Sequence, residues 1–197
     1  MLFGKNYVKR YFYFHKKTII IERNIKKGGV IVKIRQAIIE DAFGIAQVHI
    51  ASWKSTYRGI IADEILNELR LEQRISQWQQ HIENPYKTII VLENNNGIIG
   101  FADGQKVEDD VYMHYEADMT CLYLYAEQQR QGYGRQLVGE LFEKFKQQGM
   151  TSCIVKVLTG NSSHLFYEKL GAKKIDSFHA TEYGEGNTID VYAWDKI

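Results

Sequence analysis

The chain has 197 residues, of which 45% are hydrophobic and 13% aromatic, and its formal net charge is +1. This length suffices for one domain with a full core, and the composition excludes an intrinsically disordered chain. No apolar run approaches the length of a membrane-spanning helix, and the single proline, Pro85, excludes a proline-rich linker between domains.

The charge is distributed unevenly along the chain. Residues 1–29 hold eight Lys or Arg and one Glu, whereas residues 30–197 carry a net charge of −6. The acidic body disfavours nucleic acid as a partner and favours a cationic or amine ligand. We interpret residues 1–29 as a basic and aromatic extension that is disordered, is an arm binding a membrane surface or nucleic acid, or is foreign to the natural protein. The last alternative rests on Lys26-Lys27-Gly28-Gly29, which a translated ribosome-binding site would give.

The first part of the body predicts a strand, two helices and a β-hairpin. Apolar patterning predicts strands over 30–35, 88–93 and 98–105, with an Asn-rich turn between the last two. Helices are predicted over 40–57 and 63–81, because each segment opens with acidic residues and carries an apolar face.

The centre of the chain is a strand that runs into a glycine loop. Residues 121–134 read Cys-Leu-Tyr-Leu-Tyr-Ala-Glu-Gln-Gln-Arg-Gln-Gly-Tyr-Gly, and a helix is predicted from about Arg135 to Gly149. Gly132 and Gly134 allow backbone angles and close approaches that other residues do not. Such a loop points several N–H groups, and the positive end of the helix dipole, at one phosphate-binding spot. A turn that merely joins a strand to a helix is the alternative interpretation.

The remaining elements complete one sheet. Strands are predicted over 116–125, 151–158, 172–178 and 188–194, with a short helix over 161–170. Cys121 and Cys153 lie in predicted strands without metal-like spacing, so we interpret them as small buried residues in a reducing compartment. The order predicts a single α/β (α+β) domain over residues 30–197. Its mixed, mostly antiparallel central sheet would be flanked by helices.

Two motifs resemble the GCN5-related N-acetyltransferase (GNAT) superfamily. The spacing Gln129-x-x-Gly132-x-Gly134 resembles its acetyl-CoA pyrophosphate loop. The segment Asn161-Ser-Ser-His-Leu-Phe-Tyr167 is similar to a later family segment, in which an Asn opens a helix and a Tyr faces the thioester. The resemblance covers about residues 30–195. It implies the acyl-CoA N-acyltransferase fold, in which two central parallel strands splay apart, and acetyl-CoA as the acyl donor without a metal.

The resemblance also implies the roles of individual residues. The pyrophosphate would be held by the loop Gln129, Arg130, Gln131, Gly132, Tyr133, Gly134 and Arg135. The thioester arm would pair with the backbone of Leu122, Tyr123 and Leu124, and Asn161 would hold pantetheine or cap its helix. Tyr167 would contact the cofactor and protonate the leaving thiolate, since its phenol is a suitable donor.

Two further roles are open. A carboxylate in or just before the central strand, Glu116 or Asp118, is the candidate general base, and an exposed strand-edge charge is the alternative for each. Trp53 and Tyr57 lie four residues apart on one helix face. They are candidates for the wall of the acceptor pocket or for a plain core face.

The implied activity is direct transfer of an acetyl group, in a ternary complex, to a primary amine of a small molecule or amino-acid-like acceptor. Alternatives are an acetyltransferase for protein N-termini or lysines, a toxin-like member acting on tRNA, and a non-catalytic acyl-CoA sensor. We expect a cytoplasmic protein without a membrane partner, and a homodimer is an open alternative.

Overall fold

A computed structural model of the chain describes residues 7–9, 22–27 and 30–197. The strands are β1 (Tyr7–Lys9), β2 (Glu22–Lys27), β3 (Val30–Gln36), β4 (Lys87–Asn94), β5 (Gly97–Lys106), β6 (Ala117–Leu124), β7 (Cys153–Leu158), β8 (Lys173–His179) and β9 (Thr188–Trp194). The α-helices are α1 (Ala42–Thr56), α2 (Asp63–Asn67), α3 (Leu71–Glu83), α4 (Tyr133–Gln147) and α5 (His164–Lys169).

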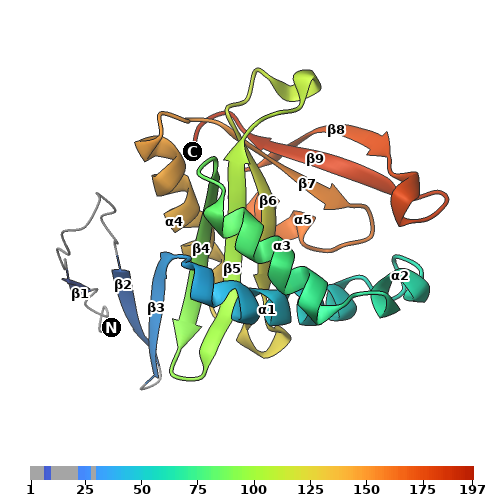
Figure 1. Cartoon of the computed structure of the whole chain (residues 1–197). Helices are drawn as coiled ribbons and strands as arrows, with labels where there is room; N and C mark the ends of the chain where they lie inside the picture. Colours follow the sequence, from blue (N-terminus) through green and yellow to red (C-terminus); the bar gives the residue numbers. More distant parts are fainter. Residues whose placement is uncertain (1–6, 10–21, 28–29) are drawn as a thin grey trace.

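The described strands form one sheet in the order β1-β2-β3-β4-β5-β6-β7-β9-β8, with helices on both faces (Figure 1). Neighbouring strands pair antiparallel except β6 and β7, which pair parallel. The predicted fold class, a mixed and mostly antiparallel sheet flanked by helices, is confirmed. Most of residues 1–29 lie outside the described residues, and the domain boundary at residue 30 stays a prediction.

Three local predictions differ from the structure. The single helix predicted over 63–81 is wrong: Arg70 is extended and separates α2 from α3. The two helices bury their side chains in different places, since Leu66 packs against Leu158 while Trp78 packs in the cluster under α1. Strand β2, which the sequence patterning did not predict, pairs antiparallel with β3. Helix α4 begins at Tyr133, two residues before the predicted start.

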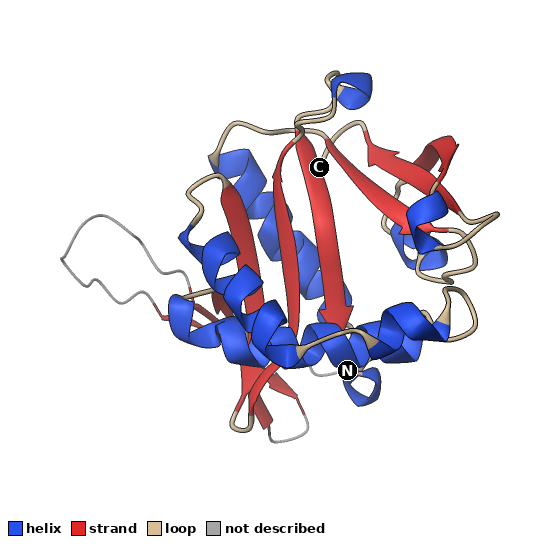
Figure 2. Ribbon diagram, turned by 45° about the vertical axis from the view of Figure 1, so that its right-hand side comes forward, coloured by secondary structure: helices blue, strands red, loops and turns tan. Residues whose placement is uncertain are grey.

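The core lies in two layers, one on each face of the sheet. Leu137, Leu141 and Phe145 recur every four residues along α4 and are fully buried against one face. On the other face, Ile45 of α1 and Trp78 of α3 are buried over β4 and β5. Figure 2 shows α4 behind the sheet and the α1 and α3 layer in front of it.

A β-bulge interrupts the centre of the sheet. The register between β5 and β6 shifts between Asp103 and Gly104, so Thr120 is an extra residue of β6 with no residue opposite it. The bulge reverses the alternation of side chains along β6, because Met119 before it and Leu122 after it both pack on the α4 face. The bulge therefore changes the face of the sheet toward which the later residues of β6 point.

The parallel strands separate just beyond this point. β6 and β7 pair over only three residues each, ending with Met119 opposite Val155. Both strands continue, β6 to Leu124 and β7 to Leu158, and they diverge (Figure 2). The splay that the resemblance implies is thus present, and it leaves the inner edges of the two strands without each other as hydrogen-bond partners.

The bulge depends on a glycine, which gives a stability prediction. A Cβ on Gly104 would lie 2.6 Å from the Phe145 ring and 2.7 Å from the carbonyl oxygen of Asp118. We expect Gly104→Ala to lower the free energy of unfolding by about 1–3 kcal/mol, because the overpacked strand must shift. Chemical denaturation monitored by circular dichroism measures this.

The matched control for that variant is Gly139→Ala in the middle of α4. A Cβ there meets nothing within 4 Å. We expect this variant to gain about 0.5–1 kcal/mol, since alanine favours a helix over glycine. Equal stability changes in the two variants would contradict the close packing described for Gly104.

Candidate functional site

A cavity of about 670 Å³ lies at the splay between β6 and β7, bordered by the end of α1, the glycine loop and α5. Most of the site residues predicted from the sequence motifs line this cavity. Those that line it are Tyr57, Leu122, Tyr123, Leu124, Gln129, Arg130, Gly132, Gly134, Arg135, Asn161 and Tyr167. Segments more than 100 residues apart in the chain therefore form one site.

The glycine loop forms one wall of the cavity. Gly132 has φ +85° and caps α4, and Arg130 has φ +58°, so the loop turns tightly into the helix. A Cβ on Gly134 would lie 3.3 Å from the Phe166 ring, so this glycine lets α4 approach α5 closely. The N-terminus of a four-turn helix and two arginine side chains thus border the same cavity, which suits an anionic phosphate group.

Tyr167 lies on α5 and lines the same cavity. Its ring packs edge-to-face against Phe166 and Trp194, which hold it in place. Burial raises the pKa of Tyr167, and the nearby phenol of Tyr57 adds to the effect. The Tyr167 hydroxyl therefore stays protonated at neutral and mildly alkaline pH and can donate a proton.

Asn161 has a structural contact at the start of α5. Its Oδ1 accepts a hydrogen bond from the backbone N–H of Ser163 at 2.9 Å. The side chain thus supports the turn that leads into α5 and borders the cavity at the same time.

Trp53 and Tyr57 are linked through the central strand. The Trp53 Nε1 donates a hydrogen bond to the Tyr123 hydroxyl at 2.9 Å, and the Tyr57 and Tyr123 hydroxyls lie 3.3 Å apart. Of the two candidates, only Tyr57 lines the cavity, and the Trp53 ring packs edge-to-face against the Tyr57 ring. Burial raises the pKa of both Tyr57 and Tyr123, so these hydroxyls are neutral.

Neither predicted general base lines the cavity. The Glu116 carboxylate accepts hydrogen bonds from the Thr151 backbone N–H at 2.5 Å and from the Thr151 hydroxyl at 2.9 Å. The backbone bond holds the pKa of Glu116 below its usual range. Asp118 pairs with Lys156 at 3.4 Å, and burial raises the pKa of its carboxyl. Glu116 and Asp118 therefore each have a partner near the end of β6 that pairs with β7, and neither lies in the cavity lining.

Two predicted loop residues also stay outside the cavity lining. The Gln131 side-chain amide donates to the Glu127 carbonyl at 3.0 Å, within the loop itself. Tyr133 is the first residue of α4, and its side chain is buried in the core, so only its backbone is available at the helix N-terminus.

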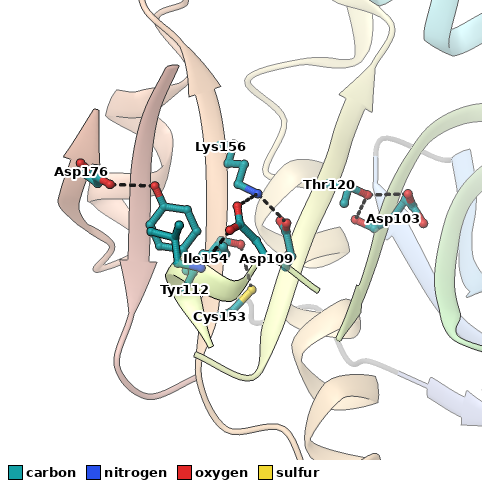
Figure 3. Close-up of polar contacts among 10 residues, drawn as sticks. Asp103, Asp109, Tyr112, Thr120, Cys153, Ile154, Lys156 and Asp176 are labelled. Atoms are coloured by element: carbon teal, nitrogen blue, oxygen red, sulfur yellow. Dashed lines mark hydrogen bonds and ion pairs between the residues drawn. The ribbon is translucent and has the colours of Figure 1, made fainter. Parts of the chain in front are cut away.

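Sequence reasoning missed two polar residues at the narrow end of the splay, Thr120 and Lys156. Lys156 pairs with Asp109 at 3.4 Å as well as with Asp118, and Thr120 contacts Asp103 (Figure 3). No sequence signal marks the bulge that carries Thr120, because threonine is an ordinary strand residue. The alternation of apolar residues in β7 indicates only that Lys156 faces away from the α4 layer.

Both cysteines lie in strands, Cys121 in β6 and Cys153 in β7. Burial raises the pKa of the Cys121 and Cys153 thiols, which disfavours either as a nucleophile. Within the described ranges, no group of three or more His, Cys, Asp or Glu residues is arranged to hold a metal ion. None of the helices found in those ranges has the length and apolar character needed to cross a bilayer.

Comparison with known proteins adds to this geometry. The family model described as "Acetyltransferase (GNAT) family" matches residues 49–172. The N-acetyltransferase YuaI of Bacillus subtilis (strain 168), described as uncharacterized, is 32% identical over 145 residues, covering 73% of this chain and 82% of YuaI. The [ribosomal protein bS18]-alanine N-acetyltransferase of Haemophilus influenzae is 33% identical over 91 residues, covering 46% of this chain and 58% of the relative.

A solved structure shares the fold. The PaiA N-acetyltransferase of Thermoplasma acidophilum, determined in complex with coenzyme A, superposes with a TM-score of 0.67 at 24% identity. The superposition covers 83% of this chain and 99% of that protein.

Gly132, whose backbone lies in the left-handed region, gives a binding prediction. We expect Gly132→Ala to weaken coenzyme A binding about tenfold or more, because strain of about 1–2 kcal/mol at φ +85° displaces the N–H groups at the start of α4. Isothermal titration calorimetry with coenzyme A and the full chain measures the affinity.

Gly149→Ala is the matched control, since Gly149 also has φ +85° but follows the far end of α4. Both variants should lose similar thermal stability, and only the Gly132 variant should lose affinity. If the two variants bind coenzyme A equally well, the loop is a plain turn.

Proposed function

The chain belongs to the acetyltransferase (GNAT) family and is therefore an acyltransferase, and from this premise we propose that it transfers an acetyl group from acetyl-CoA to a primary amine. The observation that carries the proposal is that one cavity is lined by both the glycine loop and Tyr167. The loop suits the pyrophosphate of the donor, and Tyr167 suits the sulfur that leaves.

Residues of this chain account for the binding of the donor. Backbone N–H groups at the start of α4, with Arg130 and Arg135, would hold the pyrophosphate. The inner edge of β6 from Leu122 to Leu124 would pair with the amide groups of the pantetheine arm, since β7 has diverged there. When bound, acetyl-CoA supplies the activated acetyl group.

Tyr167 would act as the general acid of the transfer. Its hydroxyl donates a proton to the sulfur as the carbon–sulfur bond breaks, so that coenzyme A leaves as a thiol. The raised pKa of Tyr167 keeps this proton in place before the reaction. A backbone N–H of β6 beyond the bulge would polarise the acetyl carbonyl.

The acceptor enters on the side of α1, where Tyr57 lines the cavity and Trp53 supports it through Tyr123. The favoured acceptor is the primary amine of a small molecule or an amino-acid-like compound, in keeping with the acidic body of the chain. We place the protein in the cytoplasm, where acetyl-CoA is available.

A second candidate acceptor is the α-amine of a protein. It is favoured by the similarity to an enzyme that acetylates the alanine of ribosomal protein bS18. A peptide N-terminus presents the same primary amine as a free amino acid, so both acceptors fit the same chemistry. The two differ in whether the cavity mouth admits a continuing chain.

An amine panel with a Tyr167→Phe variant tests the proposal. The panel contains free amino acids, aliphatic diamines and a peptide with an N-terminal alanine, and release of the coenzyme A thiol is followed with a chromogenic reagent. We expect turnover with at least one amine, and in Tyr167→Phe a kcat lower by about 10²-fold or more.

Acetyl-CoA affinity is the control, because Tyr167→Phe removes one hydroxyl and leaves the loop intact. Calorimetry should give nearly the same dissociation constant for both proteins. A folded wild-type chain that does not bind acetyl-CoA, or that acetylates none of the amines, would refute the proposed function.

A further inference from the structure

A buried carboxylate lies directly beneath the narrow end of the cavity. The Thr120 hydroxyl donates a hydrogen bond to Asp103 Oδ2 at 2.5 Å, and it also lies 3.3 Å from the Asp103 carbonyl oxygen (Figure 3). The β-bulge creates this contact, because it makes Thr120 the extra residue of β6 opposite the Asp103 register shift. Bulges often re-aim a side chain next to an active site.

Asp103 is unusual for a residue inside a sheet. It is 1% exposed, and its Oδ1 has no hydrogen-bond partner among the described residues. Its ion-pair partner, the Lys87 ammonium, lies 3.7 Å from Oδ2. A buried ion pair with an unsatisfied oxygen contributes little to stability, because desolvation offsets the attraction between the charges. The fold alone therefore does not account for this carboxylate.

Thr120 connects that carboxylate to the cavity. Its side chain is exposed and lines the cavity, and it is the first residue of β6 after the last pair with β7, Met119 opposite Val155. The glycine loop borders the opposite, wide end of the splay. A donor held by its pyrophosphate at the loop and extended along β6 would bring its reactive end toward Thr120.

We propose that Thr120 takes the proton from the attacking amine and passes its own proton to Asp103. The inference rests on the proposed function and supplies the proton acceptor that Glu116 and Asp118 do not provide. Thr120 is the catalytic residue in this assignment. Asp103 is a positioning residue, which orients the Thr120 hydroxyl and receives its proton.

The nitrogen lone pair of the neutral amine forms a bond to the acetyl carbon, and the N–H protons become strongly acidic. One of them moves to Thr120 Oγ1 while the Thr120 proton moves to Asp103 Oδ2. The carbon–sulfur bond breaks, and the sulfur takes the Tyr167 proton. Asp103 is left protonated and Tyr167 ionised, and exchange with solvent through the emptied cavity returns one proton from Asp103 to Tyr167.

The groups that face Asp103 come from three elements. Lys87 lies on β4, His81 on α3, and Asp118 and Cys121 on β6. Lys87 is the cation among them, and its ammonium lies 3.7 Å from Asp103 Oδ2. Burial lowers the pKa of His81, which leaves that ring neutral at neutral pH.

Kinetics of the full chain with the fastest amine of the panel test the assignment. Asp103→Asn and Thr120→Val should each lower kcat by about 10²-fold or more, with acetyl-CoA affinity unchanged. Thr120→Ser keeps the hydroxyl and should retain most of the turnover.

Lys87→Met is the matched control for the ion pair. It breaks the same pair but leaves the hydrogen bond between Thr120 and Asp103 in place, so kcat should fall far less than in Asp103→Asn. If Asp103→Asn keeps the wild-type kcat, or if Lys87→Met matches its loss, the assignment is wrong and Asp103 is structural. A wild-type chain inactive with every amine would instead refute the proposed function together with this inference.

Discussion

The structure depends on the point where two parallel strands stop pairing. Hydrogen bonds between β6 and β7 end at Met119 and Val155, although both strands continue for several residues. Backbone N–H and C=O groups on those inner edges need partners, and an amide-bearing ligand can supply them. The other features of the cavity lie around this opening: the glycine loop at its wide end, and Thr120 at its narrow end.

The two faces of the sheet contribute opposite halves of the proposed chemistry. The face covered by α4 carries α5 with Tyr167, a neutral phenol that can donate a proton. The face covered by α1 and α3 carries Asp103 and Lys87, the buried ion pair beneath Thr120. The splay lets groups from both faces meet in one cavity, so a proton donor and a proton acceptor can lie on opposite sides of a bound thioester.

The sequence allowed the fold class to be predicted, and also the loop and strand residues that line the cavity, because both rest on local patterns. The spacing of Gln129, Gly132 and Gly134 encodes a loop geometry, and strand alternation predicts the sheet. The apolar pattern predicts one helix over 63–81 because it continues across Arg70, whereas the backbone at Arg70 is extended. The contact between Asp103 and Thr120 could not be predicted, since it depends on a bulge in the pairing of strands and not on any spacing along the chain.

Amide hydrogen exchange of the full chain, with and without acetyl-CoA, tests the central claim most directly. That claim is that the inner edge of β6 beyond Met119 takes up the donor in place of β7. We predict that acetyl-CoA protects amides between Thr120 and Tyr125 and at the start of α4, while β8 and β9 exchange as before. Binding of acetyl-CoA without protection of β6 would contradict the claim and would place the donor elsewhere on the protein.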